Sequence, residues 1–440
     1  MHERYVWQSW LLIDRWLLID RRRAAKFFFA LGLLSMPISY SAKSMFGLEI
    51  TWVDPTLVLG ILALVIIGIS ALRGTYTYSL VFCSVLSAVA GWIYLLPSET
   101  REHSALYVAT FETIRLALNL IWFAVARWMF QNERRFALRW LSVTVIWETV
   151  VALILQLILL GYFTIAGPLS VYLELYKLRQ VIWFGDFPIY RVAGTFIESP
   201  PFGLFTFCCF VIFLLEIIRL RQASESVPTW WKIVAFISLI GAISSLADEV
   251  LLAVTLLAFY LIRKHSKSRI TSSVLLALIF LAAISYVGLQ VAKKIGNAME
   301  DTNEIVGASG AERMYHTRMG FKLLADNPFA IITGIGPGRY GDYCEAYGLF
   351  PSSVTMQVTP LEWIVEYGAI GSAVIVIWLV HIGKGASRTF GTIGIYAVVS
   401  LVIAVMFQAS WKWEGWFIAL AFLDARGVSG NCHYRSESLP

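Results

Sequence analysis

Two stretches between apolar runs carry residues that could do chemistry. One contains Arg191 and Glu198 shortly before a Pro-Pro pair, and the other contains Arg313 and His316. A guanidinium group presents a planar fork of hydrogen-bond donors and stays charged, which suits a phosphate or diphosphate. An imidazole titrates near neutral pH and can act as a general base. The two stretches therefore favour the binding and activation of a phosphorylated substrate, with Arg191, Arg313 and His316 as catalytic candidates.

Each candidate also has a simpler interpretation. Arg191 could be an arginine that reaches toward a membrane surface, and His316 could be a surface histidine. Glu198 and Glu362 are alternative bases, while Glu366 lies deeper in an apolar run and has an equally plausible structural role. The residue types alone therefore do not decide which side chain is the base.

The second stretch predicts a helix from about residue 310 to residue 325, which ends before Pro328. Met314, Phe321 and Leu324 are spaced to form one apolar stripe, and Arg318 and Lys322 are expected on a solvated face. The segment Gly334-Ile-Gly336-Pro-Gly338-Arg339 follows. This segment does not follow a predicted Rossmann strand and does not begin a predicted helix. A tight glycine turn packed against another backbone is therefore favoured over a nucleotide site.

The composition determines which elements must position these residues. The chain has 440 residues, of which 58% are hydrophobic and only 15% are charged, and its mean hydropathy is +0.70. About 255 apolar residues would supply 12 membrane helices of about 20 residues each. These values exclude a soluble enzyme, a disordered chain, a fibrous protein and an outer-membrane barrel. We expect an all-α, polytopic helical membrane protein.

Net charge and cysteines add two exclusions. The net charge of +6 is expected to reflect membrane orientation and not nucleic-acid binding. The five cysteines show neither a disulfide framework nor the spacing of a zinc site, and we expect no metal and no cofactor.

Apolar runs predict 11 or 12 spans, because the last run is short. Residues 229–262 form either a helical hairpin split near Asp248 or one long bent span. The runs cover residues 27–42, 55–72, 76–96, 105–129, 139–163, 201–218, 229–247, 249–262, 270–290, 360–381, 391–408 and 413–424.

The positive-inside rule supports the twelve-span version with both termini in the cytoplasm. This topology places 22 of the 35 Lys and Arg residues on the cytoplasmic side and only three in the short outer loops. The predicted organisation is a cytoplasmic segment 1–26, spans 1–9 over 27–290 with an outer loop 164–200, a large helical periplasmic loop 291–358, spans 10–12 over 359–425, and a cytoplasmic tail 426–440. The chemistry is then expected on the extracytoplasmic face, where a diphosphate on a lipid fits better than a soluble anion.

Three motifs in this order resemble the O-antigen ligase and polymerase superfamily of the bacterial inner membrane. The first is Arg191-Val-Ala-Gly-Thr-Phe before a span that begins with proline. The second is Arg313, followed by Pro328 and then by Gly334-Ile-Gly-Pro-Gly. The third is Leu361-Glu-Trp-Ile-Val-Glu-Tyr-Gly-Ala-Ile-Gly at the start of the next span.

The resemblance implies transfer of a glycan from undecaprenyl diphosphate to a hydroxyl group of an acceptor glycan or glycolipid, with no metal or nucleotide. The resemblance also implies that Arg191 and Arg313 bind the diphosphate. A histidine of the ligases corresponds here to Gln357, whose amide is no base, and this departure favours a polymerase over a ligase. The spacing from Arg191 to Gly203 is one residue longer than the Arg-x10-Gly motif of the polymerases.

The remaining candidates for substrate binding are Glu198, Arg339, Gln357, Glu362 and Glu366. The implied partners are the lipid-linked glycan, its acceptor, the bilayer and a regulator of chain length.

Charges inside the predicted spans are costly and often functional. For Glu112 and Arg115 a structural network is favoured, with a proton or ion pathway as the alternative. Glu112 and Arg115 are three residues apart and can pair, whereas Glu148 and Glu216 lie in other spans. A secondary transporter is the main competing class. It is disfavoured because the chain shows no clear internal repeat and the large loops are not placed symmetrically.

Overall fold

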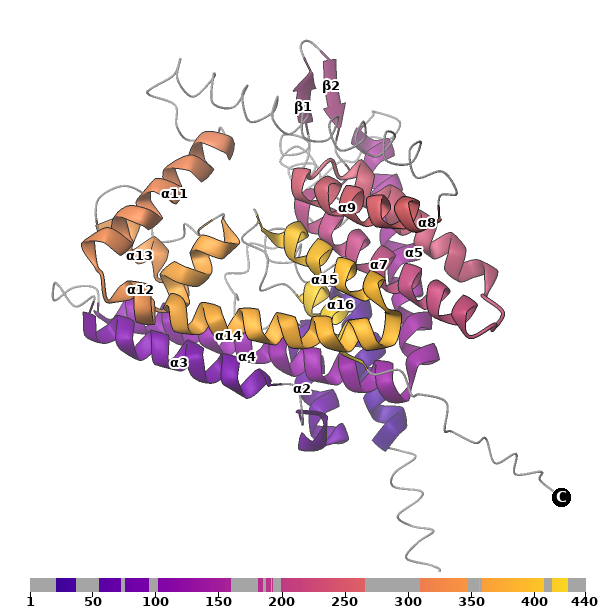
Figure 1. Ribbon diagram of the computed structural model, residues 1–440, viewed down its shortest axis with the longest axis horizontal. Helices are drawn as coiled ribbons and strands as arrows, with labels where there is room; N and C mark the ends of the chain where they lie inside the picture. The colour runs from indigo at the N-terminus through magenta and orange to yellow at the C-terminus, as the bar shows by residue number, and fades with distance from the viewer. Residues whose placement is uncertain are drawn as a thin grey trace, which may run out of the picture.

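Within the residues that it describes, the computed structural model is helical apart from one small hairpin (Figure 1). It describes residues 21–36, 55–72, 76–94, 102–159, 181–184, 187–190, 192, 199–265, 309–346, 356, 358–406 and 414–425. In the hairpin, β1 (Val181–Phe184) pairs antiparallel with β2 (Phe187–Tyr190). The all-α expectation is therefore confirmed within the described ranges, with this hairpin as an addition.

The helices form where the apolar runs predict them, and the run 270–290 lies outside the described residues. After a helix over residues 21–36, the order is α2 Pro55–Ile67, the 3-10 helix η1 Ile69–Leu72, α3 Thr77–Tyr94, α4 Glu102–Asn132, α5 Arg134–Leu159, α7 Ser199–Gln222, α8 Thr229–Ser244, α9 Asp248–His265, α11 Ser309–Asp326, α12 Ala330–Thr333, α13 Tyr340–Ala346, α14 Thr359–Phe390, α15 Thr392–Val405 and α16 Glu414–Asp424.

Four described helices are long and apolar enough to cross a membrane. They cover residues 109–132, 134–158, 200–222 and 359–390. Shorter apolar helices accompany them at residues 56–67, 77–91, 229–244 and 392–405. A transmembrane helix needs about 20 mostly apolar residues, so these helices indicate a membrane-embedded protein.

α14 is longer than the apolar run 360–381 predicts. The helix continues to Phe390, and a single residue, Gly391 (φ 72°), connects it to α15. Ile382, Ala386 and Phe390 are buried at four-residue intervals, whereas Lys384 is exposed on another face. The charged segment expected as a loop is therefore the last turns of an amphipathic helix, because one face still packs inside the protein.

The segment 229–262 is a split hairpin. α8 ends at Ser244 and α9 begins at Asp248, and Leu246 between them adopts a left-handed conformation with φ 48°. α8 packs against α7, and α9 packs against α15. Of the two alternatives, the break near Asp248 is confirmed.

α16 lies inside the helix bundle. Its 11 residues are all buried, and it packs against α4, α7 and α14 (Figure 1). At about 1.5 Å per residue it is about 16 Å long, roughly half the hydrocarbon thickness of a bilayer. A helix that is apolar on every face is typical of a protein interior, which explains why the last predicted span is short.

One end of the bundle carries a layer of ion pairs. Glu216 on α7 is bound by Arg134 of α5, with 2.8 Å from Nε to Oε2, and by Arg219, with 2.9 Å from Nη2 to Oε1. The guanidinium of Arg134 also lies over the rings of Phe390 and Phe422. Glu216, one of the charges inside the predicted spans, is thus paired with two arginines.

Two further pairs lie at the same end, Lys26–Glu133 at 2.7 Å and Arg127–Asp424 at 2.6 Å. We call this the ionic end, which is formed by the carboxyl ends of α4, α7, α14 and α16 and the amino end of α5. Glu112 and Arg115 also pair as expected, at 3.6 Å within α4.

Candidate functional site

A glycine loop joins α12 to α13 and lies against a break in α14. The loop is Gly334 to Gly338, and its three glycines have φ values of 77°, 100° and 71°, which favour glycine. Gly368, inside α14, has φ 67° and ψ −177° and interrupts the helix. Two backbone amides of the loop donate hydrogen bonds to the α14 carbonyls that precede this break. Ile335 N–H donates to Val365 O at 2.9 Å, and Gly336 N–H donates to Glu366 O at 3.1 Å.

The backbone of the loop and the backbone of α14 approach one another so closely that side chains at the two contacting glycines would not fit. A Cβ atom at Gly334 would overlap the carbonyl of Glu366, and one at Gly368 would overlap the carbonyl of Ile332. From α3, the Ser87 hydroxyl donates to the same Glu366 carbonyl, and Gly91 lies against the carbonyl of Ile335. The interpretation as a tight glycine turn against another backbone is confirmed.

α11 forms as predicted and extends over Ser309–Asp326. Its buried face is His316, Met319, Gly320 and Leu323, which follow the helical spacing, and Gly320 packs close to Leu361 at the start of α14. The predicted apolar stripe was wrong at Phe321, which is 61% exposed, and right at Leu324, which is buried, while the side chain of Met314 lies outside the described residues. The tertiary contact with α14 selects a face that includes a histidine and a glycine, which hydropathy alone would not choose.

The basic face of α11 was predicted correctly. Arg318 and Lys322 are both exposed. Arg313 lies in the second turn of the same helix, and its side chain is outside the described residues.

His316 is fully buried against Tyr340, the first residue of α13. Its Nδ1 lies 2.9 Å from the Tyr340 hydroxyl, and that hydroxyl donates to the His316 carbonyl at 3.1 Å. A hydroxyl has one proton. When Tyr340 donates it to the His316 carbonyl, a neutral imidazole donates from Nδ1 to the Tyr340 oxygen and has its lone pair at Nε2. Burial raises the pKa of Tyr340, which keeps the hydroxyl protonated. The alternative of a surface histidine is therefore wrong.

Three charged residues lie almost completely inside the protein around the loop contact. Glu362 and Glu366, one turn apart on α14, are each 4% exposed, and Arg339 at the end of the loop is 7% exposed. The Arg339 side chain lies beside Gly336, whose backbone N–H donates a hydrogen bond to the Glu366 carbonyl. Buried charges of this kind are rare outside paired or functional settings.

The remaining sequence candidates lie outside the described residues, namely Arg191, Glu198 and Gln357. Their described neighbours are anchored. Val192 N–H donates to Ser244 O at 3.2 Å at the end of α8, and Thr359 N–H donates to Met406 O at 3.0 Å. The structure thus brings His316, Arg339, Glu362 and Glu366 into one region with the helix that carries Arg313.

Sequence reasoning missed Ser87 and Tyr340. A hydroxyl inside the apolar run of α3 was the available signal for Ser87. Tyr340 had a weaker signal, its position directly after the charged end of a glycine-rich segment.

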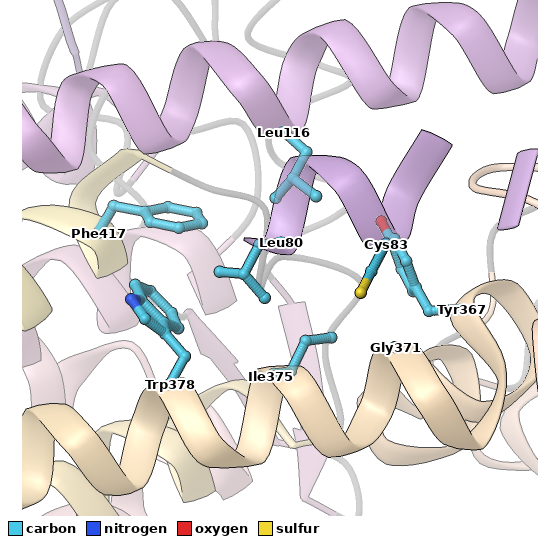
Figure 2. Close-up of a pocket in the computed structure, with 8 residues that line it drawn as sticks. All are labelled: Leu80, Cys83, Leu116, Tyr367, Gly371, Ile375, Trp378 and Phe417. Atoms are coloured by element: carbon cyan, nitrogen blue, oxygen red, sulfur yellow. The ribbon is translucent and has the colours of Figure 1, made fainter. Parts of the chain in front are cut away.

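A narrow apolar crevice lies next to the break in α14 and leads along it toward α16 (Figure 2). Its volume of about 10 Å³ is space for about one water molecule. The lining residues are Leu80, Cys83, Leu116, Tyr367, Gly371, Ile375, Trp378 and Phe417. The crevice is too small for a sugar and is a packing defect between α3, α4, α14 and α16.

Among the residues that the structure describes, no group of three or more His, Cys, Asp or Glu side chains could hold a metal ion. Comparison with models of protein families, with curated proteins and with solved structures finds no match to this chain.

Proposed function

We propose that the protein transfers a glycan from an undecaprenyl-diphosphate-linked donor to a sugar hydroxyl on the periplasmic face of a bacterial inner membrane. The proposed product is a surface polysaccharide lengthened by repeat units. The observation that carries the proposal is the docking of the glycine loop on the break in α14. This contact gathers buried Arg339, Glu362 and Glu366 beside the helix of Arg313 and His316.

The proposed site and the ionic end lie about one membrane thickness apart. Gly368 and Phe390 are both in α14, and 22 residues separate them. At about 1.5 Å per residue they are about 33 Å apart, close to the hydrocarbon thickness of about 30 Å. This separation suits a protein whose ionic end and glycine loop lie on opposite faces of a membrane. The positive-inside rule is what favours the proposed topology, with twelve spans, the ionic end and both termini in the cytoplasm, and the glycine loop outside.

In the proposed reaction, an acceptor hydroxyl oxygen bonds to C1 of the donor glycan with inversion. The bond from C1 to the diphosphate oxygen breaks, and both electrons leave with undecaprenyl diphosphate. Arg191 and Arg313 neutralise the charge that develops on the leaving group. The hydroxyl proton passes to a base, for which His316 is the first candidate and Glu198 and Glu362 are the alternatives. Arg339, Gln357 and Glu366 are assigned to substrate binding.

A reconstituted assay tests this proposal. The full-length protein in liposomes receives a lipid-linked repeat unit, and polymer is separated by length. Arg313→Ala is expected to lower the rate by about 100- to 1,000-fold if the guanidinium acts like an oxyanion donor. Arg318→Ala is the matched control, because Arg318 is an exposed arginine on the same helix.

Three results would count against the proposal. Wild-type polymer yield and length in Arg313→Ala would remove the role of that residue. A protein that moves the lipid-linked unit across the bilayer without extending it would instead be a flippase. Transfer to a lipid A-core acceptor without growth of the glycan would identify the ligase alternative.

A further inference from the structure

A hollow at the ionic end has the side chains of a phosphate site. It lies between α5 and the connection from α7 to α8 and has a volume of about 690 Å³. Its lining includes two arginines of α5, Arg135 and Arg139, and two tryptophans at the start of α8, Trp230 and Trp231. Glu225 lies on the opposite wall, and its charge acts on Arg219 of the ion-pair layer.

The two arginines differ from their neighbour Arg134. Arg134 is committed to Glu216, whereas Arg135 and Arg139 are exposed and form no ion pair with another described residue. They are four residues apart, so both guanidinium groups are on one face of the helix. Two adjacent guanidinium forks beside a hollow favour an anion with several oxygen atoms, such as a phosphate.

The face of α5 below the arginines points to a lipid as the source of that phosphate. The stripe that starts at Arg135 and Arg139 continues along the helix as Val143, Ile146, Val150, Leu153 and Leu157, which are 37% to 60% exposed. From Val143 to Leu157 this stripe is about 21 Å long at 1.5 Å per residue, enough to carry an acyl chain through one leaflet.

The packing of α5 and the tryptophans agree with this assignment. Only 33% of the apolar window of α5 is buried in the protein, compared with 83% for α7. The face of α5 is therefore available to lipid. Trp230 and Trp231 stand at the start of α8, where aromatic side chains gather at the boundary between headgroups and hydrocarbon.

We propose that this hollow binds the phosphate headgroup of an anionic phospholipid, with an acyl chain along the exposed stripe of α5. The proposal requires only that the protein is embedded in a membrane, and it is independent of glycan transfer. It adds a lipid-binding site at the end of the bundle opposite the glycine loop.

The test measures lipid retention. The full-length protein is reconstituted in vesicles of phosphatidylcholine with a minor fraction of phosphatidylglycerol, extracted gently, and weighed with its bound lipids by native mass spectrometry. We expect the wild type to be enriched in phosphatidylglycerol. Each arginine replaced by glutamine should lower the retention about fivefold, and the double variant Arg135→Gln/Arg139→Gln about 30-fold.

A matched control exists at the same end of the bundle. Lys384 and Arg388 are also exposed and four residues apart, but they do not line the hollow. Lys384→Gln/Arg388→Gln should keep the wild-type enrichment, and Arg135→Lys/Arg139→Lys should keep most of it because the charges remain. All variants should elute as the wild type does in size-exclusion chromatography, since the changed side chains are exposed.

Equal retention of phosphatidylglycerol in the wild type and the double arginine variant would overturn the proposal. So would an equal loss in the control pair, which would reveal only general attraction to a basic surface. A third arm adds inorganic phosphate at saturating concentration. Displacement of the lipid by phosphate alone would show that a soluble anion is the ligand, whereas retained lipid supports the phospholipid.

Discussion

Replacing Gly368 by alanine should release the glycine loop from α14. Gly368 has a backbone conformation that is nearly restricted to glycine, and an alanine there costs about 1–3 kcal/mol. Its Cβ atom would also overlap the carbonyl of Ile332, and overpacking of this kind costs about 1–3 kcal/mol. Together these costs are about 2–6 kcal/mol.

The hydrogen bonds that hold the loop on α14 are similar in magnitude to this strain. Two backbone hydrogen bonds and the bond from Ser87 join the loop to α14, and each contributes about 1 kcal/mol. The substitution should therefore shift the loop toward an undocked state in which the strain is relieved. Even about 2 kcal/mol of destabilisation would raise the undocked population about 30-fold.

The thiol of Cys344 reports this change. It is fully buried on α13 directly after the loop, and burial raises its pKa, so little reactive thiolate forms at neutral pH. In a background that lacks Cys432 and the partly exposed Cys83, maleimide labelling of Gly368→Ala should be about 30-fold faster than in the parent. Polymer formation should fall in parallel.

Gly383→Ala is the matched control within α14. A Cβ atom there meets nothing within 4 Å, and the backbone is helical, so alanine should stabilise the helix by about 0.5–1 kcal/mol. If Gly368→Ala labels at the parental rate, or if Gly383→Ala labels as fast as Gly368→Ala, strain at Gly368 does not release the loop. A loss of total helicity in circular dichroism would mean that the variant unfolds globally and that the loop contact is not a separate unit.

Three further predictions follow from the buried polar contacts. Ser87→Ala removes one hydrogen bond to the Glu366 carbonyl and should raise the labelling rate of Cys344 about fivefold, which corresponds to about 1 kcal/mol. Glu216→Gln leaves its two arginine partners without a buried counter-charge and should lower the free energy of unfolding in detergent by about 3–5 kcal/mol. His316→Ala should lower polymer formation at least 100-fold and abolish the limb of the pH–rate profile that reports the base.

Each of these substitutions has a control that distinguishes the loss of one contact from a general loss of folding. Exposed Ser226 and Glu225 serve as sites for the matching Ser→Ala and Glu→Gln changes, which should leave the labelling rate and the unfolding transition unaltered. Tyr340→Phe removes the hydroxyl that contacts His316 but retains the imidazole. If Tyr340→Phe lowers the rate as much as His316→Ala and neither changes the pH profile, the histidine is a structural element and a carboxylate takes the role of base.

The positions of the helices were predictable because each depends on a local property. An apolar run of sufficient length has few alternatives to a helix in a membrane, since its backbone groups must be satisfied internally. The same holds for α11, which ends before Pro328, and for the glycine loop, whose residue types are suited to positive φ.

The partners of these elements were not predictable, because hydropathy does not distinguish contact with lipid from contact with protein. Phe321 was expected in a buried stripe and is exposed, whereas His316 was weighed as a surface residue and is fully buried. The charged end of α14 was expected as a loop, yet its other face packs inside the bundle to Phe390.

Residue order alone is enough to predict a helical, membrane-embedded protein, the positions of its helices and one tight glycine turn. These properties follow from composition and from the conformational limits of single residues. The docking of the loop on a break at Gly368, the contact of Tyr340 with His316 and the pairing of Glu216 with Arg134, but not with Arg135, are properties of the folded chain. These contacts form between segments that are far apart in the sequence. Residue type and local spacing therefore do not predict them.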